Sequence, residues 1–295
     1  NNLISKNINE KNKFLSINFE KIKFKFDLKS LSLFIETNNP EIKFENTLIP
    51  VSNIKAFLKF KSIVILKPQI DKISILSNEI TTEQLKKLIV KLKPNNFNSF
   101  IINKIKKGKL IANLDIYFND DLSIENYIVK GNVMEMQAII ADDIFLRKTN
   151  FDFFFDKSDI IIKKINSNLT GLVIKDGVVR ITGDDEINLK SELKTEININ
   201  KENSQKYLPY VEDFKILNDD TIFIAKLDQI INISFDKTFK VIDSNYSVNG
   251  EVKKFFIKFK KSISNSYLKK DVESLIFSNS KFKFAKSSDN KKTIN

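Results

Sequence analysis

Hydrophobic and polar positions alternate along most of the chain. The clearest case lies within 106–133, where every second residue is apolar from position 110 to 118. Successive side chains of an extended strand point to opposite faces, so this alternation is typical of a half-buried β-strand. Asn119-Asp120-Asp121 follows, and it predicts a turn because Asn and Asp favour turns. This stretch therefore predicts one strand and the start of a hairpin.

A second pattern is repeated along the chain. The motif Tyr127-x-Val129-x-Gly131-x-Val133 returns as Tyr246-x-Val248-x-Gly250-x-Val252. The repetition of one hairpin motif indicates a repeating sheet and disfavours the core of an enzyme. Between the two copies, apolar residues alternate on either side of a turn at 157–159, which predicts another hairpin.

The same alternation defines the expected organisation. It runs through 14–260 as one continuous, mostly β region, and the repeat suggests two sheet units that meet near 140–200. Residues 1–13 are polar and are expected to be frayed. Residues 261–295 are rich in Ser, Lys and Asn, and are expected to form a loosely ordered tail.

One segment has helical spacing instead. Thr81-x-x-Gln84 is a capping-box pattern, and an apolar stripe follows before Pro94. A helix over 82–93 is therefore predicted. It is interpreted as a cover over one end or edge of a sheet, with a lid or plug over an apolar groove as the less favoured alternative.

Composition removes several kinds of chemistry. The chain has no Cys and no His, which excludes disulfides, the usual zinc sites and catalysis by these residues. Acidic pairs occur at 120–121, 142–143 and 184–186, each between strand signals, where Asp favours turns. No catalytic residue, metal site or cofactor is expected, and the predicted function is non-enzymatic.

The net charge of +12 is compatible with a nucleic acid or an anionic membrane as partner. Lys alternates with Phe at 21–26 and 253–260. Within a strand the two residue types point to opposite faces, so bases stacked on the rings would not meet those lysines. An apolar face backed by a solvated basic face fits the pattern better, and no nucleic-acid partner is expected.

Three stretches carry a family resemblance: 50–75 (PVSNIKAFLKFKSIVILKPQIDKISI), the segment TTEQLKKLIVKLKP, and KGKLIANLDIYFND with YIVKGNV. Over 14–260 the chain resembles AsmA/TamB-like proteins of the Gram-negative envelope, which are related in architecture to chorein-type bridge-like lipid-transfer proteins. The resemblance implies a long, twisted antiparallel sheet curled into an open groove, with one or two short helices. It supplies no catalytic signature.

The resemblance also implies a location and partners. Such proteins are anchored in the inner membrane and project into the periplasm, where they take part in outer membrane biogenesis. No apolar run here approaches the roughly 18–20 residues that span a bilayer, and the chain opens at Asn1 without a signal peptide. It is therefore expected to be a piece of a longer protein whose anchor lies upstream. The implied partners are phospholipids and envelope membranes; no protein partner is indicated.

Lipid binding requires a continuous apolar track, worth about 0.8 kcal/mol for each buried CH₂ group. The predicted lipid-groove residues share strand positions of apolar parity: Leu110, Ala112, Leu114, Ile116, Phe118, Phe151, Phe153, Phe155, Ile233, Phe235, Ile257 and Phe259. One alternative is a closed all-β scaffold or adhesion module in which these residues form a dry core. A basic, sheet-based nucleic-acid binder is the second alternative.

Overall fold

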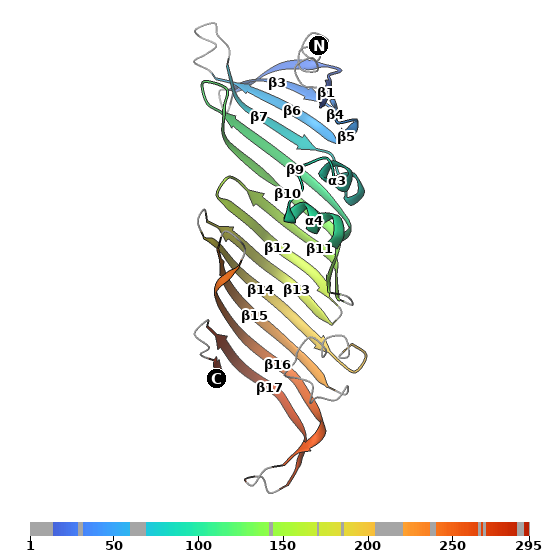
Figure 1. Cartoon of the computed structure of the whole chain (residues 1–295), viewed down its shortest axis with the longest axis vertical. Helices are drawn as coiled ribbons and strands as arrows, with labels where there is room; N and C mark the ends of the chain where they lie inside the picture. The colour runs from blue at the N-terminus through green and yellow to red at the C-terminus, as the bar shows by residue number, and fades with distance from the viewer. Residues whose placement is uncertain are drawn as a thin grey trace. The chain divides into compact units, whose positions relative to one another are not determined.

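A computed structural model describes residues 14–28, 32–59, 69–141, 144–169, 171–183, 186–203, 221–236, 240–264, 267, 270–287 and 292–294. Strands dominate it, and two short helices complete it (Figure 1). The hydrogen-bonded order β18-β17-β16-β15-β14-β13-β12-β11-β10-β9-β7-β6-β3-β2, with β8 beside β9, forms one 15-stranded antiparallel sheet. The sheet is open, because its order ends at β2 and β18. The predicted fold class is confirmed.

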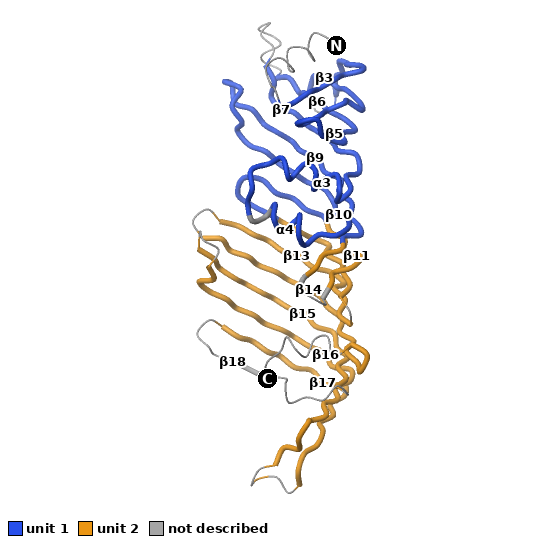
Figure 2. The backbone as a smooth tube through the Cα atoms, turned by 45° about the vertical axis from the view of Figure 1, so that its right-hand side comes forward, with its two compact units in different colours: residues 1–136, 152–160 blue, residues 137–151, 161–295 orange. Residues whose placement is uncertain are grey.

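The chain divides into two compact units, shown in blue and orange in Figure 2. Unit 1 comprises 1–136 and 152–160, and unit 2 comprises 137–151 and 161–295. The boundaries between the units fall at 136/137, 151/152 and 160/161, and the sequence predicts two sheet units that meet near 140–200. Each unit contains one copy of the Tyr-x-Val-x-Gly-x-Val strand.

Unit 1 holds the two described helices and most of the shorter strands. A three-stranded sheet of order β1-β4-β5 accompanies its part of the large sheet. The elements are β1 (Leu15–Asn18), β2 (Ile22–Asp27), β3 (Ser32–Asn38), β4 (Glu41–Phe44), β5 (Thr47–Ile49), β6 (Val51–Leu58), β7 (Ile70–Ser77), β8 (Ile80–Thr81), α3 (Thr82–Ile89), α4 (Asn96–Lys104) and β9 (Ile105–Phe118).

Strands β10 (Ile124–Ala141), β11 (Ile144–Phe155) and β12 (Asp159–Leu169) contribute residues to both units. The predicted hairpin turns at 119–121 and 157–159 join β9 to β10 and β11 to β12. The remaining strands belong to unit 2: β13 (Leu172–Thr182), β14 (Ile187–Ile199), β15 (Ile222–Phe235), β16 (Val241–Ile263), β17 (Val272–Lys286) and β18 (Lys292–Ile294).

Helix α3 begins where its capping box predicts. The Thr81 hydroxyl accepts a hydrogen bond from the Gln84 backbone N–H at 3.3 Å, and the Gln84 side-chain oxygen accepts one from the Thr81 N–H at 2.9 Å. The helix ends at Ile89, four residues before the predicted end. A second helix, α4, starts after Asn95, whose side chain caps the Asn98 N–H. Contacts of α3 with β5, β8 and β9 agree with a helix that covers part of a sheet.

The expectation of a loosely ordered tail is wrong for Val272–Lys286, which forms β17 along β16. Phe282 and Phe284 pair with Gly250 and Val248, so these two side chains lie on the apolar face of the sheet. Its many Ser and Lys residues hid this alternation in the sequence. The frayed segment expected at 1–13 lies outside the described residues.

Candidate functional site

One face of the unit 1 sheet is apolar, and two of the predicted groove residues lie within it. Ile116 of β9 starts a row of directly paired residues that crosses the neighbouring strands: Ile73, Ala56, Ile35 and Phe24. Leu114 starts the adjacent row with Ile75 and Ile54. Directly paired residues of an antiparallel sheet project from the same face and touch. These rows therefore form one continuous apolar patch, here called apolar face 1.

Gly131 of β10 lets a ring settle on this face. A Cβ at Gly131 would lie 2.8 Å from Cζ of Phe153 and 2.1 Å from the carbonyl oxygen of Ile111. The Phe153 ring thus takes the space that a side chain would fill, and the Gly131 position also abuts Ala112 at 3.0 Å. Phe155 follows, with its ring centroid 6.1 Å from that of Phe153. The fold brings Ala112 and Phe153 together at one glycine, with Phe155 stacked on Phe153.

The two remaining β9 candidates lie at the ends of the strand. Leu110 pairs with the buried Ile80 of β8, and Phe118 is the last residue of β9. Both are half-buried. At the β2 end of the order, Phe24 and Phe26 stay exposed on the same apolar face.

The opposite face of unit 1 holds a buried carboxylate. Glu36 is only 6% exposed and is paired across the sheet with Lys55, whose ammonium lies 3.7 Å away. Lys25 forms a second ion pair with Glu36, and Asn53 donates a hydrogen bond to it at 3.1 Å. The hydrogen bond from Lys25 is the main reason that the pKa of Glu36 lies below its ordinary value. The site reads as a structural ion cluster.

Aromatic rings also lie on this polar face. The Lys72 ammonium lies 4.5 Å from the ring centroid of Phe57 and 5.7 Å from that of Tyr117. Phe57 in turn packs against Phe34, with centroids 5.2 Å apart. Burial raises the pKa of the Tyr117 hydroxyl. The face opposite the apolar one is therefore not the purely solvated basic surface that the alternation predicts.

Unit 2 has the more deeply buried apolar patch, here called apolar face 2. Its centre is a cluster of five side chains between 3% and 8% exposed: Ile197, Ala225, Leu227, Val248 and Val252. Six half-buried side chains pack against that cluster: Leu172, Ile199, Phe223, Tyr246, Phe255 and Phe282. All of them project from strands β13 to β17 of the same sheet. Their neighbours along this face therefore supply much of their shielding.

Rings line one end of apolar face 2 and cover its glycine. Phe255 packs against Phe223 and Phe277, with centroids 5.0 and 6.0 Å away. A Cβ at Gly250 would lie 2.0 to 2.7 Å from three ring atoms of Phe282. As at Gly131, a strand glycine makes room for a phenylalanine of the next strand, a recognised device in β-sheets.

The predicted residues of β15 and β16 lie at opposite ends of apolar face 2. Ile233 pairs with Leu189, and Phe235 pairs with Ile187 and Val241, near the turn from β15 to β16. Ile257 is buried and pairs with Leu275 at the far end, and Phe259 follows two residues later. The fold places all four on one face but does not bring the two pairs together.

Phe151 lies on the same face, which can be traced through β12. Phe151 and Thr149 are two residues apart on β11 and so project from one face, and the Thr149 hydroxyl lies 2.6 Å from that of Ser167. Ser167 and Ile165 likewise share a face of β12, and Ile165 lies 3.3 Å from where a Gly177 Cβ would be. Gly177 pairs with Leu193, next to the central cluster. Phe151 therefore lies on the apolar side of unit 2.

The other face of unit 2 carries alternating charge. Glu196, Lys226, Glu251 and Lys281 are paired in one row, and the Lys281 ammonium lies 3.3 Å from Glu251. An open hollow of about 530 Å³ adjoins this row, and all four charged residues of the row line it. Its lining also includes Ile197, Ala225 and Val252 of the central cluster.

Acidic side chains are the candidate ligands for a metal site. Among the described residues, no group of three or more Asp or Glu side chains could hold a metal ion. Asp121 accepts hydrogen bonds from the hydroxyl and the N–H of Ser123, and these lower its pKa. It acts as a turn residue, as predicted. The pairs at 142–143 and 184–185 lie outside the described residues.

The lipid-groove residues predicted from the sequence do not include the central residues of the two apolar faces. Ile54, Ile73 and Ile75 surround Leu114 and Ile116, and Leu227 and Val248 centre apolar face 2. Each has the right parity within its own strand. What singles them out is the register between strands, which alternation within one strand does not reveal.

No protein-family model, curated protein or solved structure matches the chain. In the part of the chain that the structure describes, neither helix has the length and apolar character needed to cross a membrane.

Proposed function

We propose that the chain binds the acyl chains of phospholipids on its two apolar faces, without a chemical step. The observation that carries this proposal is apolar face 2, which extends over β13 to β17. The described residues of unit 2 contain strands and turns but no helix, so no helix of that part of the chain covers the face. An apolar sheet face without a covering layer favours an apolar ligand.

The two faces of each strand suit the two ends of a lipid. Methylene groups gain about 0.8 kcal/mol each when they leave water, while a headgroup remains hydrated. Side chains such as Leu227 and Phe223 offer the first environment, and the charged row opposite stays in water. With the resemblance to AsmA/TamB-like proteins, this supports a role in lipid transport between the inner and outer membranes. The proposed location is the periplasm, attached to the inner membrane by a segment outside this chain.

The test compares two neighbouring isoleucines of β15. Ile231 pairs with Ser191 and Tyr246 on apolar face 2, whereas Ile230 pairs with Glu192 and Ser247 on the charged face. Ile231→Asp and Ile230→Asp therefore introduce the same charge, one residue apart, on opposite faces. Native mass spectrometry and lipid extraction would measure phospholipid that copurifies with the full chain.

We expect bound phospholipid in the wild-type protein and in Ile230→Asp, and its loss in Ile231→Asp, with β-type circular dichroism retained in all three. If all three proteins are folded and free of lipid, and none takes up labelled phospholipid, the proposal is wrong.

A closed scaffold is the second candidate, and one observation favours it. Ala225 and Val248 are 3% and 4% exposed, as in a dry core. In that case the apolar side chains satisfy one another, and the protein acts as a structural or adhesion module. Lipid-free protein that unfolds cooperatively would support this candidate.

A further inference from the structure

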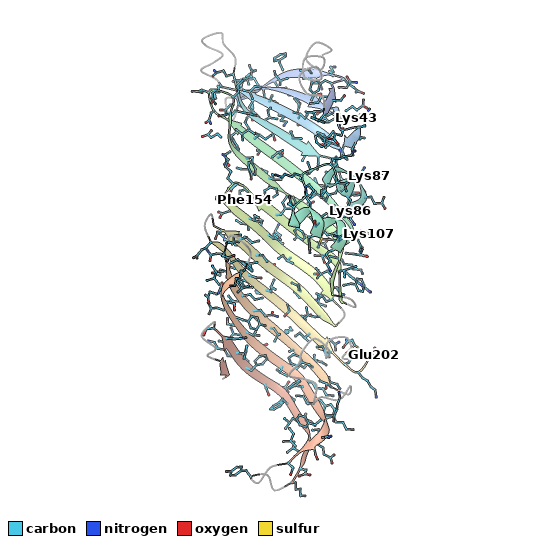
Figure 3. The ribbon with its side chains drawn as sticks, viewed as in Figure 1. Lys43, Lys86, Lys87, Lys107, Phe154 and Glu202 are labelled. Atoms are coloured by element: carbon cyan, nitrogen blue, oxygen red, sulfur yellow. The ribbon has the colours of Figure 1, made fainter. Side chains whose placement is uncertain are left out.

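The positive charge of the chain is concentrated around the two helices. Residues 82–109 contain eight lysines and one glutamate, a net charge of +7, whereas the whole chain carries +12. The segment spans α3, α4 and the start of β9. Figure 3 labels Lys86, Lys87 and Lys107 on the side of unit 1 that carries the helices, with Lys43 of β4 on the same side.

Most of these lysines are not neutralised by acidic neighbours. Lys91 lies 3.6 Å from Glu45, and Lys109 lies 2.9 Å from Glu79. The other six form no ion pair with any residue that the structure describes: Lys86, Lys87, Lys93, Lys104, Lys106 and Lys107. The result is a positive surface that lacks its counter-charge.

Large apolar side chains are exposed among the lysines. Val90 is 66% exposed, Leu92 50% and Phe100 48%. The helices keep other residues inward, since Ile89 of α3 and Ile101 of α4 are buried. Helices that contact each other and the sheet on one side, and present both lysines and apolar groups on the other, resemble interfacial amphipathic helices.

We infer that this helix-pair surface, made of Lys86, Lys87, Lys104 and Lys107 with Val90, Leu92 and Phe100, docks unit 1 on a bilayer that contains anionic phospholipids. Each lysine near an anionic surface adds to the attraction, and the apolar side chains enter the boundary between headgroups and acyl chains. The inference does not depend on the proposed acyl-chain binding, because docking on intact vesicles is measured separately.

The hairpin of β16 and β17 is the competing surface. Among the described residues, β16 beyond Phe256 pairs only with β17, and Ile276 and Phe277, which pair with Phe256 and Phe255, are exposed. The lysines there are accompanied by Asp271 and Glu273, within a few residues of the exposed side chains. Charge complementarity to an anionic surface is therefore weaker than at the helix pair, and the hairpin provides the matched control.

The first experiment measures co-sedimentation of the full chain with vesicles. The vesicles are phosphatidylcholine alone or an equimolar mixture with phosphatidylglycerol. The helix variant replaces four lysines by glutamine (Lys86→Gln, Lys87→Gln, Lys104→Gln, Lys107→Gln), and the control variant replaces four in β16 (Lys253→Gln, Lys254→Gln, Lys258→Gln, Lys260→Gln). Both lose the same charge. We expect the helix variant to bind mixed vesicles at least ~10-fold more weakly than the control variant does.

The second experiment uses the absence of Trp from the chain. A single Phe100→Trp or Ile276→Trp substitution gives fluorescence from one site only, and Ile276 is 67% exposed. We expect mixed vesicles to shift the emission of Phe100→Trp to the blue and to leave that of Ile276→Trp unchanged. Equal binding by the two glutamine variants, a blue shift at position 276 alone, or no binding to mixed vesicles would each overturn the inference.

Discussion

The large sheet buries different side chains in the two units. In unit 1 a carboxylate, Glu36, is buried between two lysines on the polar face, while the apolar face keeps Phe24 and Phe26 exposed. In unit 2 the apolar face buries Leu227 and Val248, and Glu251 and Lys281 on the opposite face stay exposed. Both units are built from strands with the same alternation of apolar and polar residues.

The difference shows that alternation decides the face of a residue but not its depth. Depth depends on the residues paired with it two or three strands away, and on whether rings or lysine stems cover it. Leu114 and Leu227 both occupy apolar-parity positions of their strands, yet Leu114 is half-buried and Leu227 is buried. The two units should therefore respond differently to the same substitution.

The largest difference is expected at these two leucines. Leu227→Ala removes buried methyl groups from the central cluster and should cost about 2–4 kcal/mol of unfolding free energy. Leu114→Ala, at a half-buried position, should cost about 1–2 kcal/mol. Hydrogen exchange followed by mass spectrometry on peptides of β14–β15 and of β7–β9 measures both. Equal losses of protection in the two units would show that the contrast in burial has no energetic meaning.

The two glycines of the repeated motif sharpen the comparison. At Gly131 the atom nearest to a new Cβ is the carbonyl oxygen of Ile111, whereas at Gly250 the three nearest atoms all belong to the ring of Phe282. A backbone atom cannot move aside, so Gly131→Ala should cost about 2–3 kcal/mol and Gly250→Ala about 1–2 kcal/mol.

Rescue separates the two cases. Replacing the ring, as Phe282→Leu, should restore most of the thermal stability lost in Gly250→Ala, because the clash disappears. Phe153→Leu should not restore Gly131→Ala. Thermal unfolding followed by circular dichroism measures each pair, and rescue at both sites would contradict the role assigned to the Ile111 carbonyl.

The buried carboxylate of unit 1 gives a pH-dependent effect. The pKa of Glu36 is lowered in the fold from an ordinary value of 4.5, chiefly by the hydrogen bond from Lys25. Its ionised form therefore stabilises the fold above that value, and the contribution is lost as the pH falls through the lowered pKa. Glu36→Gln should cost about 1–2 kcal/mol at neutral pH. Urea unfolding at a series of pH values should show the gap to wild type closing in acid; a gap independent of pH would contradict this assignment.

The smallest effect is expected on the charged row of unit 2. Glu251 and Lys281 are exposed, and exposed ion pairs contribute little because water and salt screen them. Glu251→Gln should change the unfolding free energy by less than about 0.5 kcal/mol. The same urea titration at neutral pH provides the measurement, and a loss as large as that of Glu36→Gln would remove the distinction between the two polar faces.

Much of the fold is readable from the sequence. The alternation around Leu114 predicts β9, the acidic turn that follows predicts its hairpin, and the Thr81–Gln84 capping box predicts the start of α3. These features are local, so a short stretch of sequence contains all the information. The two copies of the glycine motif likewise fall in strands whose glycines accept a ring.

The features that the sequence leaves open are non-local. The sequence does not predict strand β17, because the position of Phe282 depends on its pairing with Gly250, some thirty residues earlier in the chain. The centre of apolar face 2 was missed because Leu227 and Val248 meet only once the register of β15 and β16 is known. Helix α4 was missed because Asn-rich segments have weak helical propensity.

In unit 2 each strand from β12 to β18 is hydrogen-bonded to the strands beside it in sequence. Contacts of this kind are short in chain separation, which favours rapid folding, one hairpin after another. Because each strand pairs with its neighbours in sequence, duplication of a hairpin can also change the number of strands in the sheet. A further pair of strands inserted at a turn would find partners at once and leave every existing register intact, as in other repeat architectures. Gene segments encoding such hairpins are thus free to multiply, and the repeated glycine motif is what an ancestral doubling would leave behind.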